Sequence, residues 1–545
     1  MSVEKSDQKK LTGDKSGHTK ICQYIVMLYF LAMTVVYPLY APGGYMHIGQ
    51  VKYEFFRSIS LATAAALIMV ILGSFLIHRE ISRLLSHYKQ MSVTDWFAYG
   101  YLVAVMVSYL CSPYKKDALW GAEGWYMGAI TQIMFVLIYF FFSRYFHADA
   151  RWLGIWMLST TVVFVLGICN RYSVYPIVMQ GQTEGFISTL GNINWFCGYW
   201  SVTAPIGIAA YWSSDKLWVR ILTGIYSVIA MLSGITQGSS SAYLVFIAML
   251  LVLFILSLNN NRRLYRFLEL CMMFAVCCQL GRIMKYLPGL EYNYEIYDAK
   301  SMISYVLLDS NSTIWAFMVL LGCYVLFRVL EKRGRFHIEK HKWLWGILTI
   351  AVMLMVAVTV LLWLFDNDVL NVCDIPPRTP DEDVSLGIYF DEEWGNGRGA
   401  AWNCGMEAYR NMDILHKVVG IGPDCFADYV YSIPESADKL IEQFGNLRLT
   451  NAHSEPITLL VNVGILGTAC YIGIMATGFV RYLRGAGRQP VLYLCAVGIL
   501  AYLMHNLVSF QQVLNTPFIF MILGIGEKYY AGTMQRIKAE GTSDE

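Results

Sequence analysis

The sequence predicts an all-α polytopic membrane protein with about 12 to 14 transmembrane helices and one large external loop. Hydrophobic residues make up 56% of the 545 residues and charged residues 15%, and the mean hydropathy is +0.46. Apolar runs long enough to cross a bilayer recur along the chain, and lysine and arginine gather in alternate connections between them. A soluble core could not hide this much apolar surface, so the composition excludes an ordinary soluble protein.

The individual spans are predicted from apolar runs of about 17 to 25 residues, the length that a helix needs to cross the hydrocarbon core. Fourteen such runs can be placed, at 21–40, 55–77, 94–111, 125–142, 152–169, 195–212, 221–238, 241–258, 267–283, 312–330, 344–364, 457–480, 491–510 and 515–531. The run at 267–283 and the pair within 221–258 are the least sharply bounded.

The distribution of basic residues predicts the orientation, because lysine and arginine mark the cytoplasmic side. If the N-terminus is inside and the spans alternate, the inside segments together with the span ends that border them hold 27 of the 41 lysines and arginines. Leaving out one span would move the basic cluster from Arg328 to Arg335, or the pair Arg262 and Arg263, to the outside. The sequence therefore predicts that both termini are cytoplasmic.

The chain divides into five parts. Residues 1–20 are polar and rich in lysine, which predicts a disordered cytoplasmic N-terminus. The first span is too long for a removed signal peptide and lacks its cleavage pattern, so we expect an anchor. The bundle covers 21–364, an extracytoplasmic loop with active-site residues covers 365–455, further transmembrane helices cover 456–531, and 532–545 form a cytoplasmic tail.

His453 is the first candidate catalytic residue, because it precedes a predicted membrane helix on the external side. Ser454 can cap that helix and Pro456 is tolerated in its first turn. A helix N-terminus disfavours the charged imidazolium, so His453 is expected to be neutral and able to accept a proton as a general base. The alternative is a structural histidine that caps the loop or bonds a backbone carbonyl.

Arg398 is the second candidate. It opens a predicted helix in which Trp402, Met406 and Tyr409 recur at helical spacing, so these three should form a packed face. A guanidinium presents a planar fork of donors that fits a diphosphate. The loop from Asp366 to Glu455 holds 17 acidic and 6 basic residues, so an ion pair, for example with Glu393, is the alternative.

The motif around His453 resembles that of the O-antigen ligase and polymerase superfamily. Those proteins carry a histidine followed by Asn, Ser or Gln, then nine variable residues, a glycine, two residues and a small or aromatic residue. His453, Ser454, Gly464 and Gly467 fit this pattern throughout. The resemblance extends over roughly residues 186–527.

Two further motifs carry the resemblance, and one departs from it. Gly191-Asn192-Ile193-Asn194 is similar to the family's G-N-x-N before a transmembrane helix, and Gly420 with Gly422 ahead of Phe426 is similar to its glycine motif. Family members often have an arginine after serine at a short external turn, where the segment 236–242 has serine instead. Another external cation would then be needed.

The resemblance implies a GT-C-like fold and an inverting, metal-independent glycosyltransferase in the bacterial cytoplasmic (inner) membrane, without a cofactor. The donor would be a glycan on polyprenyl diphosphate and the acceptor a hydroxyl of a glycan or lipid-linked acceptor on the extracytoplasmic face. Membrane lipids are the expected surroundings, and no nucleic acid partner is expected. In this picture His453 deprotonates the acceptor while Arg398 and a second cation hold the diphosphate.

The remaining candidates are predicted to bind substrate, and each has a structural alternative. External cations could replace the missing arginine, whereas Asn192 and Asn194 could bind sugar or cap a helix. His505, near the outer end of its span, could line the site or bond between helices. The predicted substrate-binding residues are Arg410, Arg448, Arg282, Lys285, Asn192, Asn194, Asn451 and His505, with Lys300 as a further external cation.

Three alternative functions stay open. The motif is shared by ligases and by polymerases of surface polysaccharide, so the sequence does not separate them. A lipid flippase or transporter would suit the number of spans, although the predicted spans show neither deep carboxylates nor an internal repeat. A metal-dependent mechanism would use the acidic pairs Asp366 with Asp368 or Asp381 with Asp383, but such pairs arise often in an acidic loop.

Overall fold

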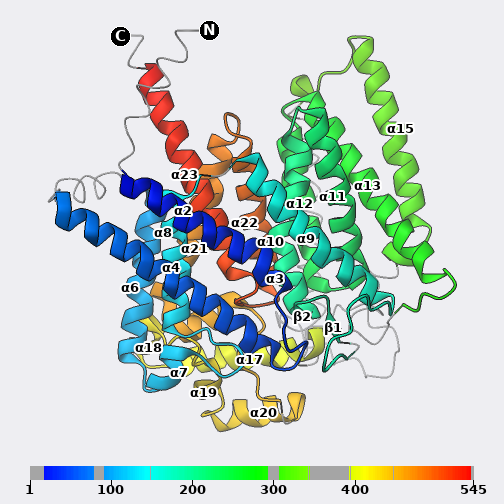
Figure 1. The fold of residues 1–545 in the computed structure, drawn as a ribbon. Helices are drawn as coiled ribbons and strands as arrows, with labels where there is room; N and C mark the ends of the chain where they lie inside the picture. The colour runs from blue at the N-terminus through cyan, green and yellow to red at the C-terminus, as the bar shows by residue number, and fades with distance from the viewer. Residues whose placement is uncertain are drawn as a thin grey trace.

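The computed structural model describes residues 17–541 except 79–90, 293–305, 344–391 and the single positions 148, 184, 342, 393 and 446. The described chain is helical almost throughout (Figure 1). Its one sheet has two strands, β1 (Phe186–Ile187) and β2 (Gly191–Asn192), which pair antiparallel with Phe186 opposite Asn192.

The first half of the chain consists mainly of long apolar helices, with a few short helices between them. In chain order these are α2 (Gly17–Leu31), η1 (Ala32–Val36), α3 (Tyr37–Leu39), α4 (Ile48–His78), α6 (Val93–Cys111), α7 (Lys115–Trp120), α8 (Ala129–Tyr145), α9 (Ala150–Arg171), α10 (Ile193–Ser213), α11 (Leu217–Gln237) and α12 (Ser240–Ser257).

The second half holds further long helices and a group of short ones. They are α13 (Asn261–Lys285), α15 (Ser312–Lys332), η2 (Ile338–His341), α17 (Trp394–Asn411), α18 (Ile414–Val419), α19 (Phe426–Val430), α20 (Pro434–Phe444), α21 (Glu455–Gly485), α22 (Val491–Leu507) and α23 (Thr516–Gly541).

The predicted fold class is confirmed. Nine of the described helical segments are long and apolar enough to cross a membrane, and α8 and α22 are shorter apolar helices. Helices α10 and α23 also lie where spans were predicted, so thirteen of the fourteen predicted runs coincide with helices. The remaining run, 344–364, lies outside the described residues.

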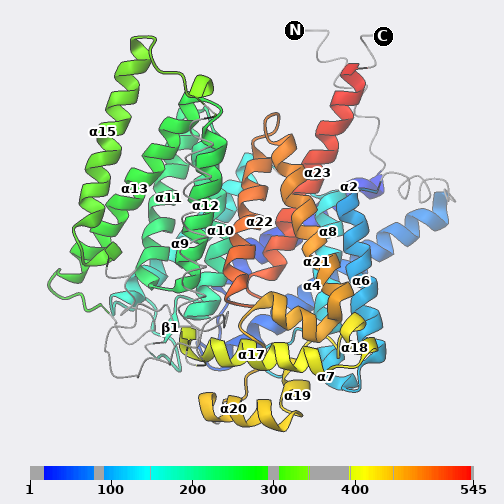
Figure 2. The same cartoon turned by 180° about the vertical axis from the view of Figure 1, so that it is seen from behind.

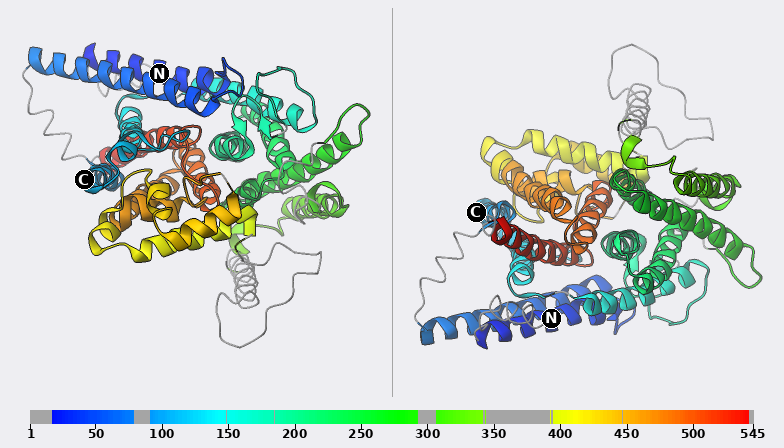
Figure 3. Two further views of the ribbon diagram at one scale, coloured as in Figure 1. Left: turned by 90° about the horizontal axis from the view of Figure 1, so that it is seen from below. Right: turned by 90° about the horizontal axis from the view of Figure 1, so that it is seen from above.

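Helix α10 forms the centre of the bundle. Figure 3 shows it end-on, with the other helices arranged around it, and nearly all of its residues are buried. It packs against α9, α11, α12, α13 and α22. Asn192 begins this helix by accepting the backbone N–H of Trp195 at 3.0 Å, which satisfies one of the amides that a helix start leaves without a partner.

Helices α17 to α20 form a small domain at one end of the molecule, together with α7 (Figures 1 and 2). This domain has its own apolar core, to which Cys404, Phe426 and Leu440 belong. Strands β1 and β2 lie at the same end. The predicted topology assigns all of these connections to one side of the membrane, and they do gather on one face, which we call the domain face.

The prediction of one uninterrupted span at 457–480 was wrong in one respect. Helix α21 is broken at Gly464, which has φ 64° and ψ −174°. A side chain at this position would touch the carbonyl oxygen of Val418 and lie 2.5 Å from the amide nitrogen of Gly420. Only glycine adopts this backbone conformation without strain. The segment from Glu455 to Val463 is therefore a separate short helix ahead of the membrane-crossing part.

Candidate active site

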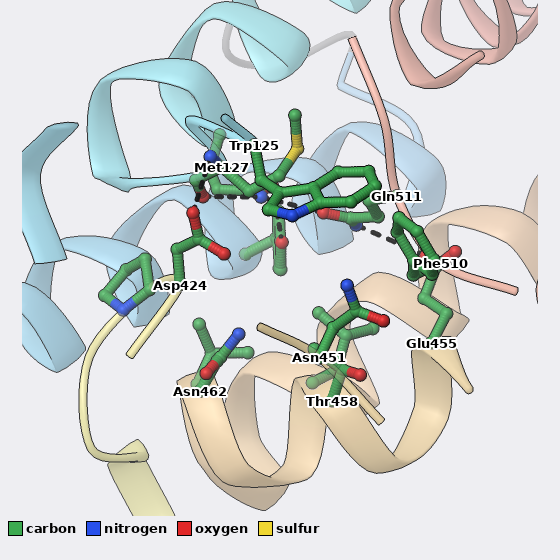
Figure 4. Close-up of a pocket in the computed structure, with 14 residues that line it drawn as sticks. Trp125, Met127, Asp424, Asn451, Glu455, Thr458, Asn462, Phe510 and Gln511 are labelled. Carbon is green, nitrogen blue, oxygen red and sulfur yellow. Dashed lines mark hydrogen bonds between the residues drawn. The ribbon is translucent and has the colours of Figure 1, made fainter. Parts of the chain in front are cut away.

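A narrow pocket lies where the small domain meets the bundle. Figure 4 shows Trp125 and Met127 on one side of it, the first segment of α21 on the other, and Asp424 and Phe510 at its flanks. Its lining residues come from five separate parts of the chain and are Tyr101, Trp125, Met127, Gln132, Pro423, Asp424, Asn451, Glu455, Thr458, Leu459, Asn462, Val463, Phe510 and Gln511.

The glycine motif at 420–422 holds the small domain against α21. The backbone N–H of Ile421 donates to the carbonyl of Val461 at 2.9 Å, and that of Gly422 donates to the carbonyl of Asn462 at 3.0 Å. A side chain at Gly420 would collide with this same carbonyl of Asn462. The two glycine motifs that were identified in the sequence thus pack directly on one another, backbone against backbone.

His453 lies just before α21 in a left-handed conformation, with φ 49°. Its backbone N–H donates to Oδ1 of Asn451 at 3.0 Å, and its ring stands edge-on to Phe510, with centroids 5.0 Å apart. Nδ1 is buried and has no hydrogen-bond partner among the described residues. A non-glycine residue held in this conformation is strained, which is common at functional sites.

The charge state of His453 follows from its surroundings. Burial, and to a smaller extent the positive charge of Arg398, lower its pKa from 6.5 to about 3. Both effects disfavour imidazolium. The expectation of a neutral ring is therefore supported, but the main cause is desolvation and not the helix end.

Arg398 lies at the start of the regular part of α17. Gly395 and Gly397 before it have positive φ angles of 60° and 83°, so the helix becomes regular at the arginine. Arg398 is partly buried, and its charge reaches His453. The proposed ion-pair partner Glu393 lies outside the described residues.

The packed face of α17 differs from the prediction. Its fully buried residues are small, among them Ala401, Cys404 and Ala408, whereas Trp402 and Tyr409 are only partly buried at the edges of that face. Small residues let α17 approach α21 closely, and a large aromatic side chain at the centre of the contact would hold the helices apart.

Glu455 is a site residue that the sequence reasoning missed. It is 3% exposed and lines the pocket. Its carboxylate accepts bonds from Gln511 at 3.3 Å, from the Tyr502 hydroxyl at 3.3 Å, and from Asn506. Gln511 in turn accepts from Gln132 at 2.7 Å. A glutamate in the first helical turn is ordinarily explained by the helix dipole, so its burial gave no signal in the sequence.

Asp424 is the second missed residue. Its Oδ2 accepts the backbone N–H groups of Ala122 and Met127, each at 2.8 Å. Burial raises the pKa of this carboxyl to about 7. Asp424 therefore ties the loop before α8 to the glycine motif and fixes one wall of the pocket. Its position directly after Gly422-Pro423 was the available signal.

His505 lies fully buried in α22, and neither ring nitrogen has a hydrogen-bond partner within the described part of the chain. The expected interhelical bond is thus not made there. Three polar side chains surround Gly198: a Cβ atom at this glycine would lie 3.3 Å from Nε2 of His505, 3.3 Å from Oε1 of Gln512 and 3.0 Å from Nδ2 of Asn515. The side-chain atoms of Gln512 and Nδ2 of Asn515 also lack partners within the described residues. His505, Gln512 and Asn515 thus form a buried polar cluster beside Gly198 of α10.

The other predicted substrate-binding cations are held elsewhere. Arg448 pairs with Asp428 at 2.7 Å, Lys285 pairs with Asp309 at 2.6 Å, and Arg282 donates to Asn311 at 2.6 Å.

Arg410 is exposed in the last turn of α17, about 18 Å along the helix from Arg398 at the usual helical rise. Lys300 lies outside the described residues. Neither the cations nor the asparagines Asn192 and Asn194 line the pocket, whereas Asn451 does.

Within the part of the chain that the structure describes, no group of three His, Cys, Asp or Glu residues is arranged to hold a metal ion. The acidic pairs at 366–368 and 381–383 lie in the segment that is not described.

Comparison with protein-family models gives a match over part of the chain. Residues 300–472 match the model of the family described as O-antigen ligase, and this region contains Arg398, His453, Gly464 and Gly467. No curated protein matches the chain. The family comprises ligases and polymerases of the glycosyltransferase type that use lipid-linked glycans in a membrane. Part of the chain, residues 300–472, is therefore similar to the O-antigen ligase family, and the described helices indicate a multi-pass membrane protein.

Proposed function

We propose that the protein transfers a glycan from a polyprenyl diphosphate donor to an acceptor hydroxyl on the extracytoplasmic side, as a ligase of surface polysaccharide. The donor diphosphate would lie between His453 and Arg398, and the acceptor would enter the pocket beside Asn451 and Glu455. The basic residues of the opposite connections support an extracytoplasmic position for the domain face.

The observation that carries this proposal is the environment of His453. Its ring is neutral because burial and Arg398 lower its pKa to about 3, and its Nδ1 has no partner in the described chain. His453 does not itself line the pocket, but it lies between Asn451 and Glu455, which do. A neutral imidazole with an unused nitrogen is suited to accept a proton.

The donor itself would make His453 an effective base. An imidazole with a pKa of about 3 is neutral but binds a proton weakly. A diphosphate beside it brings negative charge, which offsets Arg398 and raises the histidine pKa, by about 1 to 3 units for a charge within about 4 to 6 Å. Proton acceptance would then strengthen only when the donor is bound.

The reaction that we propose is a single inverting displacement. The acceptor oxygen attacks the anomeric carbon as its proton passes to His453, and the bond from that carbon to the phosphate oxygen breaks. The electron pair leaves with the diphosphate, where Arg398 stabilises the developing charge. Glu455, fixed by Gln511 and Asn506, would accept a hydrogen bond from the acceptor and orient it.

A polymerase reaction uses the same chemistry with a lipid-linked glycan as acceptor, and a flippase remains the alternative from another class. Purified protein in detergent separates an enzyme from a flippase, because detergent removes both leaflets and any gradient. The proposal expects the donor glycan to become covalently attached to an added acceptor. Binding of donor without any transfer, over a panel of lipid A-type and lipid-linked glycan acceptors, would contradict it.

A further inference from the structure

A second polar pocket lies at the end of the molecule away from the small domain. It occupies about 750 Å³ between the start of α11, the start of α13 and the end of α15, at the upper end of these helices in Figure 1. Four arginines and three carboxylates line it, together with Leu217 and Tyr265; the charged residues are Arg220, Arg262, Arg266, Arg328, Asp215, Glu269 and Glu331.

The pocket has an excess of positive charge. Asp215 is shared by two guanidinium groups, at 2.8 Å from Arg262 and 3.3 Å from Arg266. Arg220 pairs with Glu269 at 2.8 Å. Two arginines on a single carboxylate leave one positive charge uncompensated, and such a charge favours an anion nearby.

The geometry of the remaining groups also favours an anion. Nε of Arg220 is buried and has no hydrogen-bond partner among the residues that are described. Arg328 lies over the ring of Tyr265 at 4.0 Å and is 3.9 Å from Glu331, so its contact with the carboxylate is at the limit of an ion pair. A phosphate oxygen can accept from guanidinium groups in this arrangement.

An apolar groove continues from the polar pocket. The two share Leu217 and Arg220, and the groove of about 830 Å³ follows α11 past Ile221 and Ile225 to Met273 of α13. Ile221 and Ile225 are 54% and 57% exposed within a helix that is long and apolar enough to cross the membrane. A charged pocket that opens into an apolar groove along a membrane helix matches a lipid, with a phosphate at one end and a hydrocarbon chain at the other.

We propose that this site binds an anionic glycerophospholipid, with its phosphate among the arginines and one acyl chain in the groove on α11. The carboxylates of the pocket are already paired with arginines. The positive group of a zwitterionic headgroup would therefore find no free carboxylate to pair with. Basic pockets between membrane helices are suited to anionic headgroups. The site is separate from the candidate active site, and the proposal does not depend on glycan transfer.

The test measures lipid binding to the purified full-length protein by native mass spectrometry in detergent. Phosphatidylglycerol, phosphatidylcholine and inorganic phosphate serve as the three probes. We expect phosphatidylglycerol to bind on the order of tenfold more tightly than phosphatidylcholine, and Arg262→Gln and Arg328→Gln each to weaken it on the order of fivefold. Arg262 is 63% exposed and Arg328 48%, so both variants should fold.

Arg151→Gln is the matched control, because Arg151 is 83% exposed, pairs with Asp149 and does not line the pocket. Ile225→Trp should weaken phosphatidylglycerol by filling the groove while leaving inorganic phosphate unchanged. Equal binding of the two lipids, or equal effects of Arg262→Gln and Arg151→Gln, would overturn the proposal. If inorganic phosphate binds as tightly as phosphatidylglycerol, the pocket recognises an anion and not a lipid, and the proposal is also overturned.

Discussion

Replacing Gly464 by alanine should disrupt the candidate site without touching any proposed catalytic group. The residue has φ 64° and ψ −174°, a conformation that costs a non-glycine residue about 1 to 3 kcal/mol. The new methyl group would also press against the backbone of Val418 and Gly420, and overpacking of this kind costs about another 1 to 3 kcal/mol. The sum, about 2 to 6 kcal/mol, is a large share of the stability of a domain.

This strain should separate the glycine motif from α21 and shift Glu455 and His453 from their positions in the candidate site. We expect glycan transfer to fall at least tenfold and thermal unfolding in detergent to begin several degrees lower. Two controls isolate the causes. Gly498→Ala places its methyl in ordinary contact, 3.5 Å from Ile522, and Gly445→Ala has φ 59° but no atom within 4 Å. If Gly464→Ala and Gly498→Ala have the same unfolding temperature and the same rate of glycan transfer, the break in α21 has no role in the site.

Three further predictions concern the chemistry. Arg398→Lys keeps the charge but loses the bidentate geometry, so the KM for the donor should rise about tenfold or more; unchanged donor binding by Arg398→Ala would make the residue structural. As the pH is lowered, kcat should begin to fall at a higher pH than kcat/KM does, because the pKa of His453 is about 3 in the free protein and bound diphosphate raises it. If kcat and kcat/KM fall at the same pH, the donor does not activate the base. Transfer should survive exhaustive chelation with EDTA, and complete loss with recovery on adding Mg²⁺ or Mn²⁺ would redirect attention to Asp366, Asp368, Asp381 and Asp383.

The architecture could be predicted from sequence because each membrane helix is specified locally, by the length of its apolar run and by the charges that flank it. Helix α13, one of the least certain predictions, is present over Asn261–Lys285. Helix α10 was predicted although it contains Pro205. The break at Gly464 could not be predicted, since it depends on the distant backbone of Val418.

The candidate site could be predicted only where a motif marked it. His453 and Arg398 were proposed from their sequence context, and the charge of the arginine does reach the histidine; their catalytic roles stay predictions. Glu455 and Asp424 were missed because their roles arise from burial against residues far away in the chain, such as Gln511 and Met127. Pairing of external cations with neighbours such as Asp309 depends equally on the three-dimensional structure.

Turnover of purified His453→Ala tests the central claim most directly. The matched control is His416→Ala, because His416 belongs to the small domain and its Nδ1 bonds Asp413 at 2.6 Å. Loss of a general base lowers the rate by about 10² to 10⁴, so His453→Ala should lose this much transfer while it still folds and binds donor, and His416→Ala should stay near wild type. A His453→Ala protein that keeps more than about half of the wild-type turnover would contradict the assignment of His453 as the base.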